Sequence, residues 1–402
     1  MKLSRFKHFT HQITRLGKAL ILGSLLVASP AMAIKMPPPE VGAKGYLLID
    51  LTTGQELAEF NSNERLEPAS LTKLMTAYMV FSALENKQIQ PDQKVPVSTN
   101  AWKAVGSRMF IEPNRDVTVD ELVHGMIIQS GNDATTALAE LLAGDENNFA
   151  RLMNQQAKQL GMTNTNFENA TGLPGPQHYT TASDLAKLAS AIIQHFPEYY
   201  RYYSIKEYAY NGITQKNRNR LLWIDESVDG MKTGHTSSAG YCLVSSAKRT
   251  LPNGVERRLL SVVLGTESSE ARAQESLKLL NYGFQTYETV KLYSAQQAVS
   301  TSTVYKGESK EVRIGLTEDL LINVPRGMAN QLEAVVQRQN KLIAPIQKGT
   351  KLGTIQLKLN GEVLLTKPLL ALQDITEAGL FGRLIDTAKL WMNDDEEPTT
   401  AN

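Results

Sequence analysis

Strand patterning on both sides of a long helical stretch constrains the fold of this chain more than any other feature. Residues 46–50 and 56–60 read as two β-strands around a turn at Thr53-Gly54. Residues 67–200 then show mostly helical periodicity, in which apolar side chains recur three or four positions apart. The clearest examples are Leu71, Leu74, Met75, Tyr78 and Met79, followed by Leu185, Leu188, Ala189 and Ile192.

Strand patterning returns after Gly240. Residues 242–248 and 258–264 flank an Asn253-Gly254 turn, which indicates a second hairpin, and residues 268–282 read as a helix. Hairpins from both ends of a region with a helical middle favour one sheet with helices packed on it. The sequence therefore predicts an α/β (α+β) fold for this part of the chain.

The last third of the chain has a different texture. Helical periodicity stops near residue 283, and the total of 402 residues leaves room for a second domain. Asn360-Gly361 is a strong signal for a type I′ hairpin. The β-like runs cover residues 302–305, 311–314, 320–324, 332–336, 353–359 and 362–366. We therefore expect a first domain over residues 34–283 and a small β-rich domain over residues 284–375.

The first 33 residues have the pattern of a cleaved secretory signal peptide. They carry five basic residues and no acidic residue, an apolar run over residues 19–28, and an A-x-A cleavage signal at Ala31-Met32-Ala33. The alternative is an uncleaved membrane anchor. The apolar run falls well short of the ~20 residues that span a bilayer, which favours cleavage and export.

The C-terminal segment, residues 376–402, predicts an amphipathic helix and an acidic tail. An amphipathic helix of this size can lie in a membrane interface, although it can also dock on the β-rich domain or dimerise. The acidic run at residues 394–397 argues against lipid binding, because anionic lipids repel it. The apolar face holds Leu380, Phe381, Leu384, Ile385, Ala388, Trp391 and Met392, and the polar face holds Arg383, Asp386, Thr387, Lys389 and Asn393.

Composition excludes several classes of protein. The 42 basic and 41 acidic residues leave no broad basic field, so we expect no nucleic-acid partner. The single cysteine, Cys242, excludes an internal disulfide and a cysteine-rich metal site. The histidines show no metal-ligand spacing, and we expect His124 and His195 to be packed helix residues. We therefore expect neither a metal nor another cofactor.

The first chemical motif is Ser70-Leu71-Thr72-Lys73. Pro68 suits the entry to a helix, and residues three apart share a helix face, so the lysine amine can reach the serine hydroxyl. A neutral lysine can deprotonate a serine nucleophile. The same spacing occurs at Ser4 to Lys7 and Ser245 to Lys248, so this motif alone is weak.

Two further motifs follow along the chain. Ser130-Gly131-Asn132 offers a hydroxyl for proton relay and an amide that can hold a substrate amide, although such residues also cap helices. Lys232-Thr233-Gly234 occurs once, directly before the second hairpin. A cation and a hydroxyl there suit a carboxylate, and the glycine allows close approach of substrate backbone. The alternative is an edge strand with a protective lysine.

The ordered set is far more specific than its parts. Ser-x-x-Lys, Ser-x-Asn and Lys-Thr-Gly together are the motifs of penicillin-binding proteins and class A β-lactamases. Over essentially its whole length the chain resembles the low-molecular-mass penicillin-binding proteins, specifically the D-alanyl-D-alanine carboxypeptidases. The matching segments are residues 67–73, 131–134 and 229–236. The resemblance implies a transpeptidase-like domain, with an antiparallel sheet flanked by helices and a helical subdomain, followed by a small all-β domain.

The resemblance also implies catalytic roles. Ser70 would be the acylated nucleophile, Lys73 its general base, and Ser130 the group that passes a proton to the leaving D-alanine. The backbone N–H groups of Ser70 and His235 would form the oxyanion hole. The substrate-binding residues would be Asn132, Lys232, Thr233, Gly234, His235 and Arg272, with Arg272 on the terminal carboxylate.

Further implications concern the surroundings of the site. Asp184 and Arg218 would form a supporting ion pair near it. The substrate would be the peptidoglycan pentapeptide that ends in D-Ala-D-Ala, and β-lactam antibiotics would be covalent inhibitors. The C-terminal helix would hold the exported enzyme on the periplasmic face of the cytoplasmic membrane.

Three other readings use the same residues differently. A class A β-lactamase is usually a single domain with a deacylating glutamate, and residues 170–184 show no clear glutamate motif. A D-alanyl-D-alanine endopeptidase would act on cross-linked peptides, a difference that the motifs do not report. A non-catalytic envelope scaffold would be expected to have degenerate motifs, whereas every reactive side chain is present.

Overall fold

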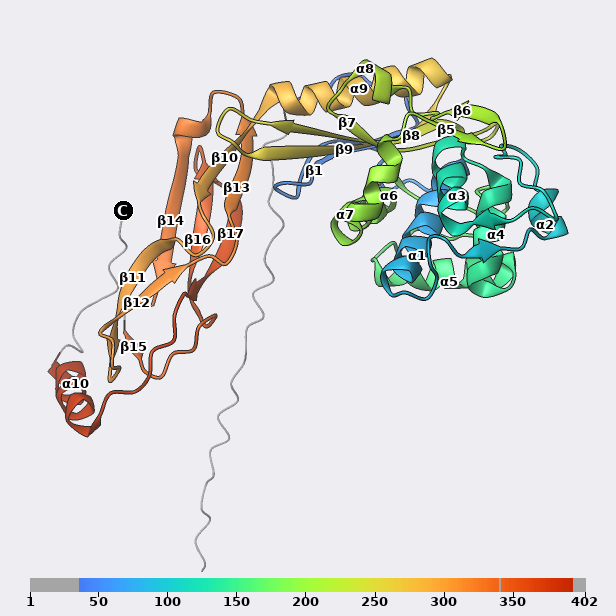
Figure 1. The fold of residues 1–402 in the computed structure, drawn as a ribbon. Coiled ribbons are helices and arrows are strands. Elements are labelled where there is room, and N and C mark those ends of the chain that lie inside the picture. Colours follow the sequence, from blue (N-terminus) through green and yellow to red (C-terminus); the bar gives the residue numbers. More distant parts are fainter. Residues whose placement is uncertain (1–35, 340, 393–402) are drawn as a thin grey trace, which may run out of the picture.

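The computed structural model describes residues 36–339 and 341–392, so the signal peptide and the acidic run 394–397 lie outside the described residues. Figure 1 shows a sheet-and-helix body and an elongated β domain, which meet at the C-terminal end of the long helix α9 (Ser269–Thr286). Among the described residues, no helix is both long and apolar enough to cross a bilayer.

A five-stranded antiparallel sheet lies at the centre of the first body, with strand order β2-β1-β9-β8-β7. The N-terminal hairpin pairs with the later one through β1 and β9, where Leu48 lies opposite Ser261. The prediction of one sheet built from both ends of the region is therefore confirmed. The strands are β1 (Gly45–Asp50), β2 (Gln55–Phe60), β7 (Val228–Thr236), β8 (Gly240–Thr250) and β9 (Glu256–Thr266).

Both faces of this sheet are buried, because successive side chains of a strand point to opposite faces. Val262 belongs to the core shared with the helical subdomain, whereas its neighbour Val263 packs in the core under α9. Figure 1 shows α9 on one side of the sheet and α6 with the other helices of the subdomain on the opposite side. The subdomain helices are α1 (Lys73–Glu85), α2 (Thr99–Trp102), α3 (Val119–His124), α4 (Asn132–Ala143), α5 (Glu146–Gln159), α6 (Ala182–His195) and α7 (Pro197–Tyr200).

Shorter elements connect these layers and carry several motif residues. A 3-10 turn, η1 (Ala69–Thr72), leads into α1, and a π-helical turn, η2 (Gly125–Gln129), ends at Ser130. The remaining short elements are η3 (Arg201–Ser204), α8 (Leu221–Ile224), the pair β3 (Lys94–Val95) and β4 (Val117–Thr118), and the hairpin β5 (Glu207–Tyr210) and β6 (Ile213–Lys216).

The second body is the small all-β domain predicted after residue 283. Its strands form a two-stranded sheet, β10-β13, and a six-stranded sheet, β14-β16-β17-β12-β11-β15, around a separate apolar core. The helix α10 (Leu380–Met392) lies at its far end (Figure 1). The other elements are β10 (Tyr287–Tyr293), β11 (Ala298–Tyr305), β12 (Glu311–Gly315), β13 (Leu320–Pro325), η4 (Ala329–Gln331), β14 (Leu332–Arg338), β15 (Leu342–Ile343), β16 (Lys351–Leu359) and β17 (Glu362–Ala371).

A buried polar cluster joins the two bodies. Arg257 on β9 donates from Nε to Asp50 Oδ2 on β1 at 2.7 Å, and both residues are 0% exposed. Asn323 on β13 donates from Nδ2 to the same carboxylate oxygen at 2.8 Å. Arg257 Nη1 also donates to the carbonyl of Tyr287 at 3.0 Å. One carboxylate thus links strands of both bodies.

Candidate active site

The local backbone places Ser70 and Lys73 side by side. Ala69 has a left-handed φ of 46°, and η1 then carries Ser70 into the start of α1 at Lys73. The helical spacing brings Lys73 Nζ to 3.0 Å from Ser70 Oγ. The first motif therefore assembles as a hydroxyl and an amine within hydrogen-bond distance.

Lys73 is almost fully buried, and its side chain is 1% exposed. Its Nζ also donates to Asn132 Oδ1 at 2.7 Å and to the carbonyl oxygen of Thr171 at 2.6 Å. Burial, with a smaller contribution from the charge of Arg218, lowers the pKa of Lys73 to about 7, although the charges of Glu146 and Asp133 act in the opposite direction. A substantial neutral fraction at neutral pH suits a general base.

The second motif lies at the junction between two helical elements. Ser130 ends η2 with a left-handed φ of 63°, Gly131 is the N-cap residue of α4, and Asn132 begins that helix. Asn132 Nδ2 donates to the carbonyl of Val105 at 2.6 Å, while Oδ1 accepts from Lys73. The amide thus connects Lys73 to the loop that carries Ser107.

The carboxylate of Asp133 also binds the loop over residues 105–111. Its carboxylate accepts the backbone N–H groups of Met109, Phe110 and Ile111 at 2.9, 2.8 and 3.2 Å. The carboxylate is fully buried, so these three donors compensate for its loss of hydration. The loop over residues 105–111 is therefore fixed to the start of α4 at two consecutive side chains.

The third motif lies on β7, at the edge of the sheet that faces η1. Lys232 is 2% exposed, and its Nζ donates to Ser130 Oγ at 2.8 Å and to the carbonyl of Thr233 at 3.0 Å. Burial holds the pKa of Lys232 well below its usual value, and the nearby charges of Lys73, Arg218 and Arg272 lower it further.

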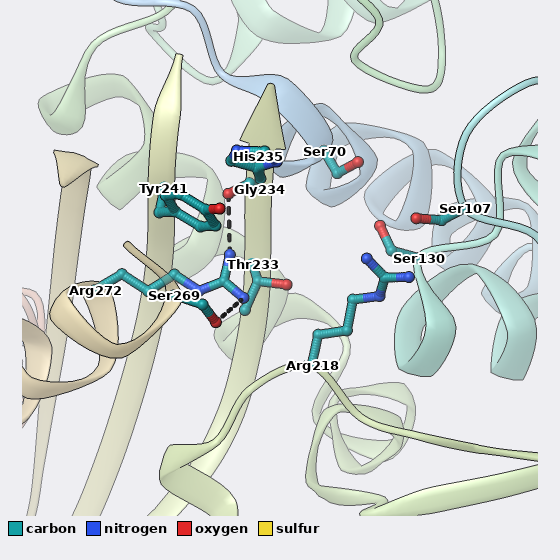
Figure 2. A pocket seen from close by; sticks show the side chains of 10 residues that line it. All are labelled: Ser70, Ser107, Ser130, Arg218, Thr233, Gly234, His235, Tyr241, Ser269 and Arg272. Carbon is teal, nitrogen blue, oxygen red and sulfur yellow. Dashed lines mark hydrogen bonds between the residues drawn. The ribbon is translucent and has the colours of Figure 1, made fainter. Parts of the chain in front are cut away.

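A cavity of about 380 Å³ opens between these elements (Figure 2). Seven of its lining residues were singled out in the sequence: Ser70, Ser130, Arg218, Thr233, Gly234, His235 and Arg272. Ser107, Tyr241 and Ser269 also line it and were missed. In the structure Tyr241 on β8 pairs with His235 on β7, and the centroids of their rings lie 3.9 Å apart. No sequence pattern indicated Ser107.

Arg272 lies in the first turn of α9 and points toward β7. Its Nη1 donates to the carbonyl of Gly234 at 3.2 Å, and Nη2 donates to Ser269 Oγ at 3.3 Å, as Figure 2 shows. Burial lowers the pKa of Arg272 to about 10, so the guanidinium remains charged at neutral pH. A buried cation at this end of the cavity suits a carboxylate ligand.

The predicted ion pair between Asp184 and Arg218 is wrong. Within the described part of the chain, Asp184 pairs with Lys187 three residues later on α6, at 2.9 Å. Its other carboxylate oxygen accepts from the N–H of Asn164 and the hydroxyl of Thr165, both at 2.8 Å. The helix therefore satisfies this carboxylate locally, away from the cavity.

Arg218 instead lines the cavity, and its guanidinium extends toward Ser130 in Figure 2. Its neighbours fix the backbone there: Asn217 Nδ2 donates to the carbonyl of Ile205 at 2.9 Å, and Asn219 Nδ2 to the carbonyl of Gly230 at 2.9 Å. Burial lowers the pKa of Arg218. Two lysines and two arginines thus converge on a site that holds Ser70 and Ser130, which favours an anionic substrate group.

No group of three or more histidine, cysteine, aspartate or glutamate residues among the described positions could hold a metal ion. His124 is packed as expected, and its ring stacks on that of Tyr208. The same expectation is wrong for His195, which is exposed near the end of α6, although the Tyr78 hydroxyl lies 3.1 Å from its Nδ1.

Comparison with known proteins gives consistent matches over both bodies. A family model described as D-alanyl-D-alanine carboxypeptidase matches residues 32–268, and one described as penicillin-binding protein 5, C-terminal domain, matches residues 287–377. The chain is 42% identical to the D-alanyl-D-alanine carboxypeptidase DacC of Escherichia coli strain K12, over 93% of this chain and 96% of that relative.

Solved structures extend the comparison to the fold. Penicillin binding protein 5 from Haemophilus influenzae is 40% identical with a TM-score of 0.79, over 85% of this chain and 100% of that chain. Penicillin-binding protein D2 from Listeria monocytogenes, solved in an ampicillin-bound form, is 32% identical with a TM-score of 0.56, over 62% of this chain and 100% of that chain.

Proposed function

Because the chain belongs to the D-alanyl-D-alanine carboxypeptidase family, whose model matches residues 32–268, we propose that Ser70, Lys73 and Ser130 carry out its acyl transfer. The enzyme is a serine-type carboxypeptidase that removes the terminal D-alanine of peptidoglycan pentapeptide and is acylated by β-lactams. The observation that carries the assignment is the 3.0 Å contact between the buried Lys73 Nζ and Oγ of Ser70, which lines the cavity.

Acylation begins with transfer of the Ser70 proton to neutral Lys73. The Ser70 oxygen then attacks the carbonyl carbon of the peptide bond between the two D-alanines. Negative charge develops on the carbonyl oxygen, and we assign the backbone N–H groups of Ser70 and His235 as its donors. His235 lies on the edge strand β7, and an edge strand leaves part of its backbone groups free of partner strands.

Departure of D-alanine needs a proton on its amine. Ser130 is the donor in this proposal, and Lys232, 2.8 Å from Ser130 Oγ, resupplies the hydroxyl. The carbon–nitrogen bond breaks as the amine takes up the proton, which leaves an ester on Ser70. The proton held by Lys73 is then passed to Lys232, which restores a neutral Lys73. A water molecule adds to the ester carbonyl and gives one proton to Lys73, and Lys73 passes that proton to the Ser70 oxygen as the ester bond breaks.

Substrate binding uses the positive wall of the cavity. Thr233 and Arg272 bind the terminal carboxylate, since a guanidinium and a hydroxyl both donate to carboxylate oxygens. Asn132 orients the peptide amide, and the absence of a side chain at Gly234 lets β7 lie close against the turn that carries Ser70. The charge of Arg272 and its place in the cavity lining support the first assignment.

β-Lactams follow the first half of this scheme. Ring opening acylates Ser70, but the former amide nitrogen stays attached to the acyl group and does not diffuse away. We therefore expect a persistent acyl-enzyme. A class A β-lactamase is disfavoured because the chain carries the β domain matched over residues 287–377. Cross-linked peptides remain a second possible substrate, because the same residues would serve an endopeptidase.

The enzyme is exported, and we further propose that α10 holds it on the periplasmic face of the cytoplasmic membrane. Phe381 and Trp391 are 85% and 87% exposed, so the apolar face of α10 is not covered by the β domain. The opposite face docks on that domain through Asp386, which accepts from the N–H of Lys306 and from Lys310 Nζ at 2.8 Å. An exposed apolar face with aromatic residues suits a lipid interface.

The assignment of Ser70 is tested by intact mass spectrometry of the mature protein mixed with penicillin G. A lasting adduct on Ser70, absent in Ser70→Ala, is expected, together with D-alanine release from a pentapeptide. An adduct that forms and disappears within seconds would favour a β-lactamase. Labelling of another serine would contradict the site, and no adduct at all would favour a non-catalytic scaffold.

A further inference from the structure

The segment over residues 166–180, here called the clamp segment, lies directly against the catalytic turn. It is bound at its ends by bridges between Asn166 and Tyr179 and between Leu66 and Thr180. At its middle, Gly172 has a φ of +87°, and a Cβ on it would lie 1.9 Å from the carbonyl oxygen of Ala69. The clamp segment thus contacts the backbone that carries Ser70, with no room for a side chain between them.

Asn169 folds the middle of the clamp segment. Its Oδ1 accepts the backbone N–H groups of Thr171, Gly172 and Leu173 at 3.2, 2.7 and 3.2 Å. A side chain that caps three successive amides fixes the direction of the carbonyl groups among them. As a result, the carbonyl of Thr171 points to Lys73 Nζ at 2.6 Å.

This carbonyl completes the hydrogen bonding of the general base. A neutral amine has two N–H donors and one lone pair. If the two N–H groups of Lys73 are donated to Thr171 O and Asn132 Oδ1, the lone pair is left for the Ser70 hydroxyl. Without Thr171 O, the amine could rotate and turn its lone pair away from Ser70. The clamp segment therefore controls the orientation of the base as well as its burial.

The side chains of Glu146 and His178 hold the clamp segment in place by hydrogen bonds near the Thr171 carbonyl. Glu146, in the first turn of α5, accepts the N–H of Ala170 at 3.0 Å. His178 accepts the N–H of Glu168 on Nδ1 at 3.1 Å, so its Nε2 carries the proton and donates to Thr72 Oγ1 at 2.8 Å. Thr72 immediately precedes the catalytic lysine in the chain.

We propose that Glu146 and His178 are positioning residues for the general base Lys73, acting through the clamp segment and its Thr171 carbonyl. The inference rests on the proposed role of Lys73. Neither residue touches the reacting atoms. Glu146 acts through the amide next to Thr171 and through its charge, whereas His178 ties the clamp segment to the turn that carries Ser70.

The negative charge of Glu146 acts on the pKa of Lys73, and this effect can be measured separately from its hydrogen bond. The charged groups that face Lys73 are Glu146 from α5, Asp133 from α4, Arg218 and Lys232. The nearby His178 has its pKa lowered to about 4 by burial, so it is neutral in the range of interest. Because Glu146 raises the pKa of Lys73, removal of its charge should lower that pKa and enlarge the neutral fraction at acidic pH.

The first experiment follows the rate of Ser70 acylation by penicillin G against pH. Glu146→Gln keeps an acceptor for the N–H of Ala170. In this variant the acidic limb of the pH–rate profile should shift to lower pH by about half a unit, with little change in the maximal acylation rate at high pH. Glu146→Ala should also lower the maximal acylation rate by about tenfold, because the hydrogen bond from the N–H of Ala170 is lost. Glu198→Gln on α7 is the matched control, since Glu198 is exposed and its charge removal should leave the limb in place.

The second experiment compares two substitutions of His178. Gln places an amide N–H near the position of Nε2 and can still donate to Thr72, whereas Asn retains an acceptor near Nδ1 and cannot reach Thr72. Acylation should therefore be about tenfold slower in His178→Asn than in His178→Gln. Thermal unfolding of both variants measures any general loss of stability, which would lower both rates alike.

The outcomes separate this inference from the proposed function. If the wild-type protein forms no adduct on Ser70, the proposed function fails. If the adduct forms but the acidic limb is unchanged in Glu146→Gln, or the two His178 variants react equally fast, the positioning role is wrong.

Discussion

Lys232 Nζ lies 2.8 Å from Ser130 Oγ, although the two residues are 102 positions apart in the chain. The contact joins the edge strand β7 to the turn that begins α4, and so closes the cavity between the sheet and the helical subdomain. The two residues come from different motifs of the sequence, Ser130-Gly131-Asn132 and Lys232-Thr233-Gly234. Their contact places a hydroxyl beside an amine in the lining that also holds Ser70.

Loss of the Ser130 hydroxyl should therefore slow the chemical step more than binding. Ser130→Ala is expected to lower kcat for D-alanine release by about 10²- to 10⁴-fold, the usual contribution of a positioned proton donor, with KM changing little. Steady-state kinetics on a pentapeptide measures both constants. Ser107→Ala is the control: Ser107 lines the same cavity but has no role in proton transfer, so a similar drop in kcat there would contradict the assignment.

With Lys73 as the proposed general base, its low pKa should set the pH dependence of acylation. Because its pKa is about 7, the amine becomes protonated as pH falls through 7 and can no longer accept the Ser70 proton. The acylation rate should therefore decrease about tenfold per pH unit below that point and level off above it. Stopped-flow acylation with a chromogenic β-lactam measures the profile. A rate that stays constant down to pH 5 would exclude Lys73 as the base.

Close packing at Gly234 should make this position intolerant of a side chain. A Cβ there would lie 2.8 Å from the carbonyl oxygen of Pro68 and 3.2 Å from the N–H of Leu71, so β7 and the Ser70 turn would have to separate. Gly234→Ala is expected to lower the acylation rate by about 10- to 100-fold, because small displacements of reacting groups are costly. Gly254→Ala is a useful comparison, since nothing lies within 4 Å of its Cβ position, although its φ of +79° adds strain.

Local sequence signals predicted the elements of the fold well, and contacts between distant segments less well. The hairpins at Thr53-Gly54 and Asn253-Gly254 are confirmed because turn chemistry and alternation act over a few residues. That β1 pairs with β9 depends on burial of both sheet faces, which no local pattern encodes. The sheet was therefore predicted as an arrangement, but its strand order was not.

The site shows the same division. Side chains with distinctive chemistry, such as Ser70 and Lys232, were found in the sequence because their spacing forms a motif. The Thr171 carbonyl was missed, since any residue has one and only the fold directs it to Lys73. The predicted ion pair between Asp184 and Arg218 was wrong because Asp184 pairs locally with Lys187, three residues later on the same helix.

The buried pair at the junction of the two bodies should contribute strongly to stability. The side chains of Asp50 and Arg257 are both inaccessible to solvent. Asp50→Ala would therefore leave the Arg257 charge buried without its partner, and should lower the free energy of unfolding by about 3–5 kcal/mol. Urea unfolding followed by intrinsic fluorescence measures the change. Asp116→Ala is the matched control: its ion pair with Lys94 is about 70% exposed, and its loss should cost at most about 1 kcal/mol. Equal effects of the two substitutions would contradict a structural role for the buried pair.

The exposed face of α10 gives a prediction about the membrane. Leu384 is 67% exposed on the side of the helix that faces away from the docked Asp386. Leu384→Glu places a charge in the middle of the apolar face and should weaken cosedimentation with vesicles of phosphatidylethanolamine and phosphatidylglycerol by at least tenfold, because a buried charge is costly in the interface. Penicillin acylation of the soluble protein should not change, since α10 lies at the far end of the β domain from the first body (Figure 1).

Gln347→Glu adds the same charge at an exposed site of the β domain and should leave vesicle binding intact. If both variants bind vesicles like the wild-type protein, α10 is not the anchor. If both lose binding equally, general charge repulsion explains the result and the apolar face does not.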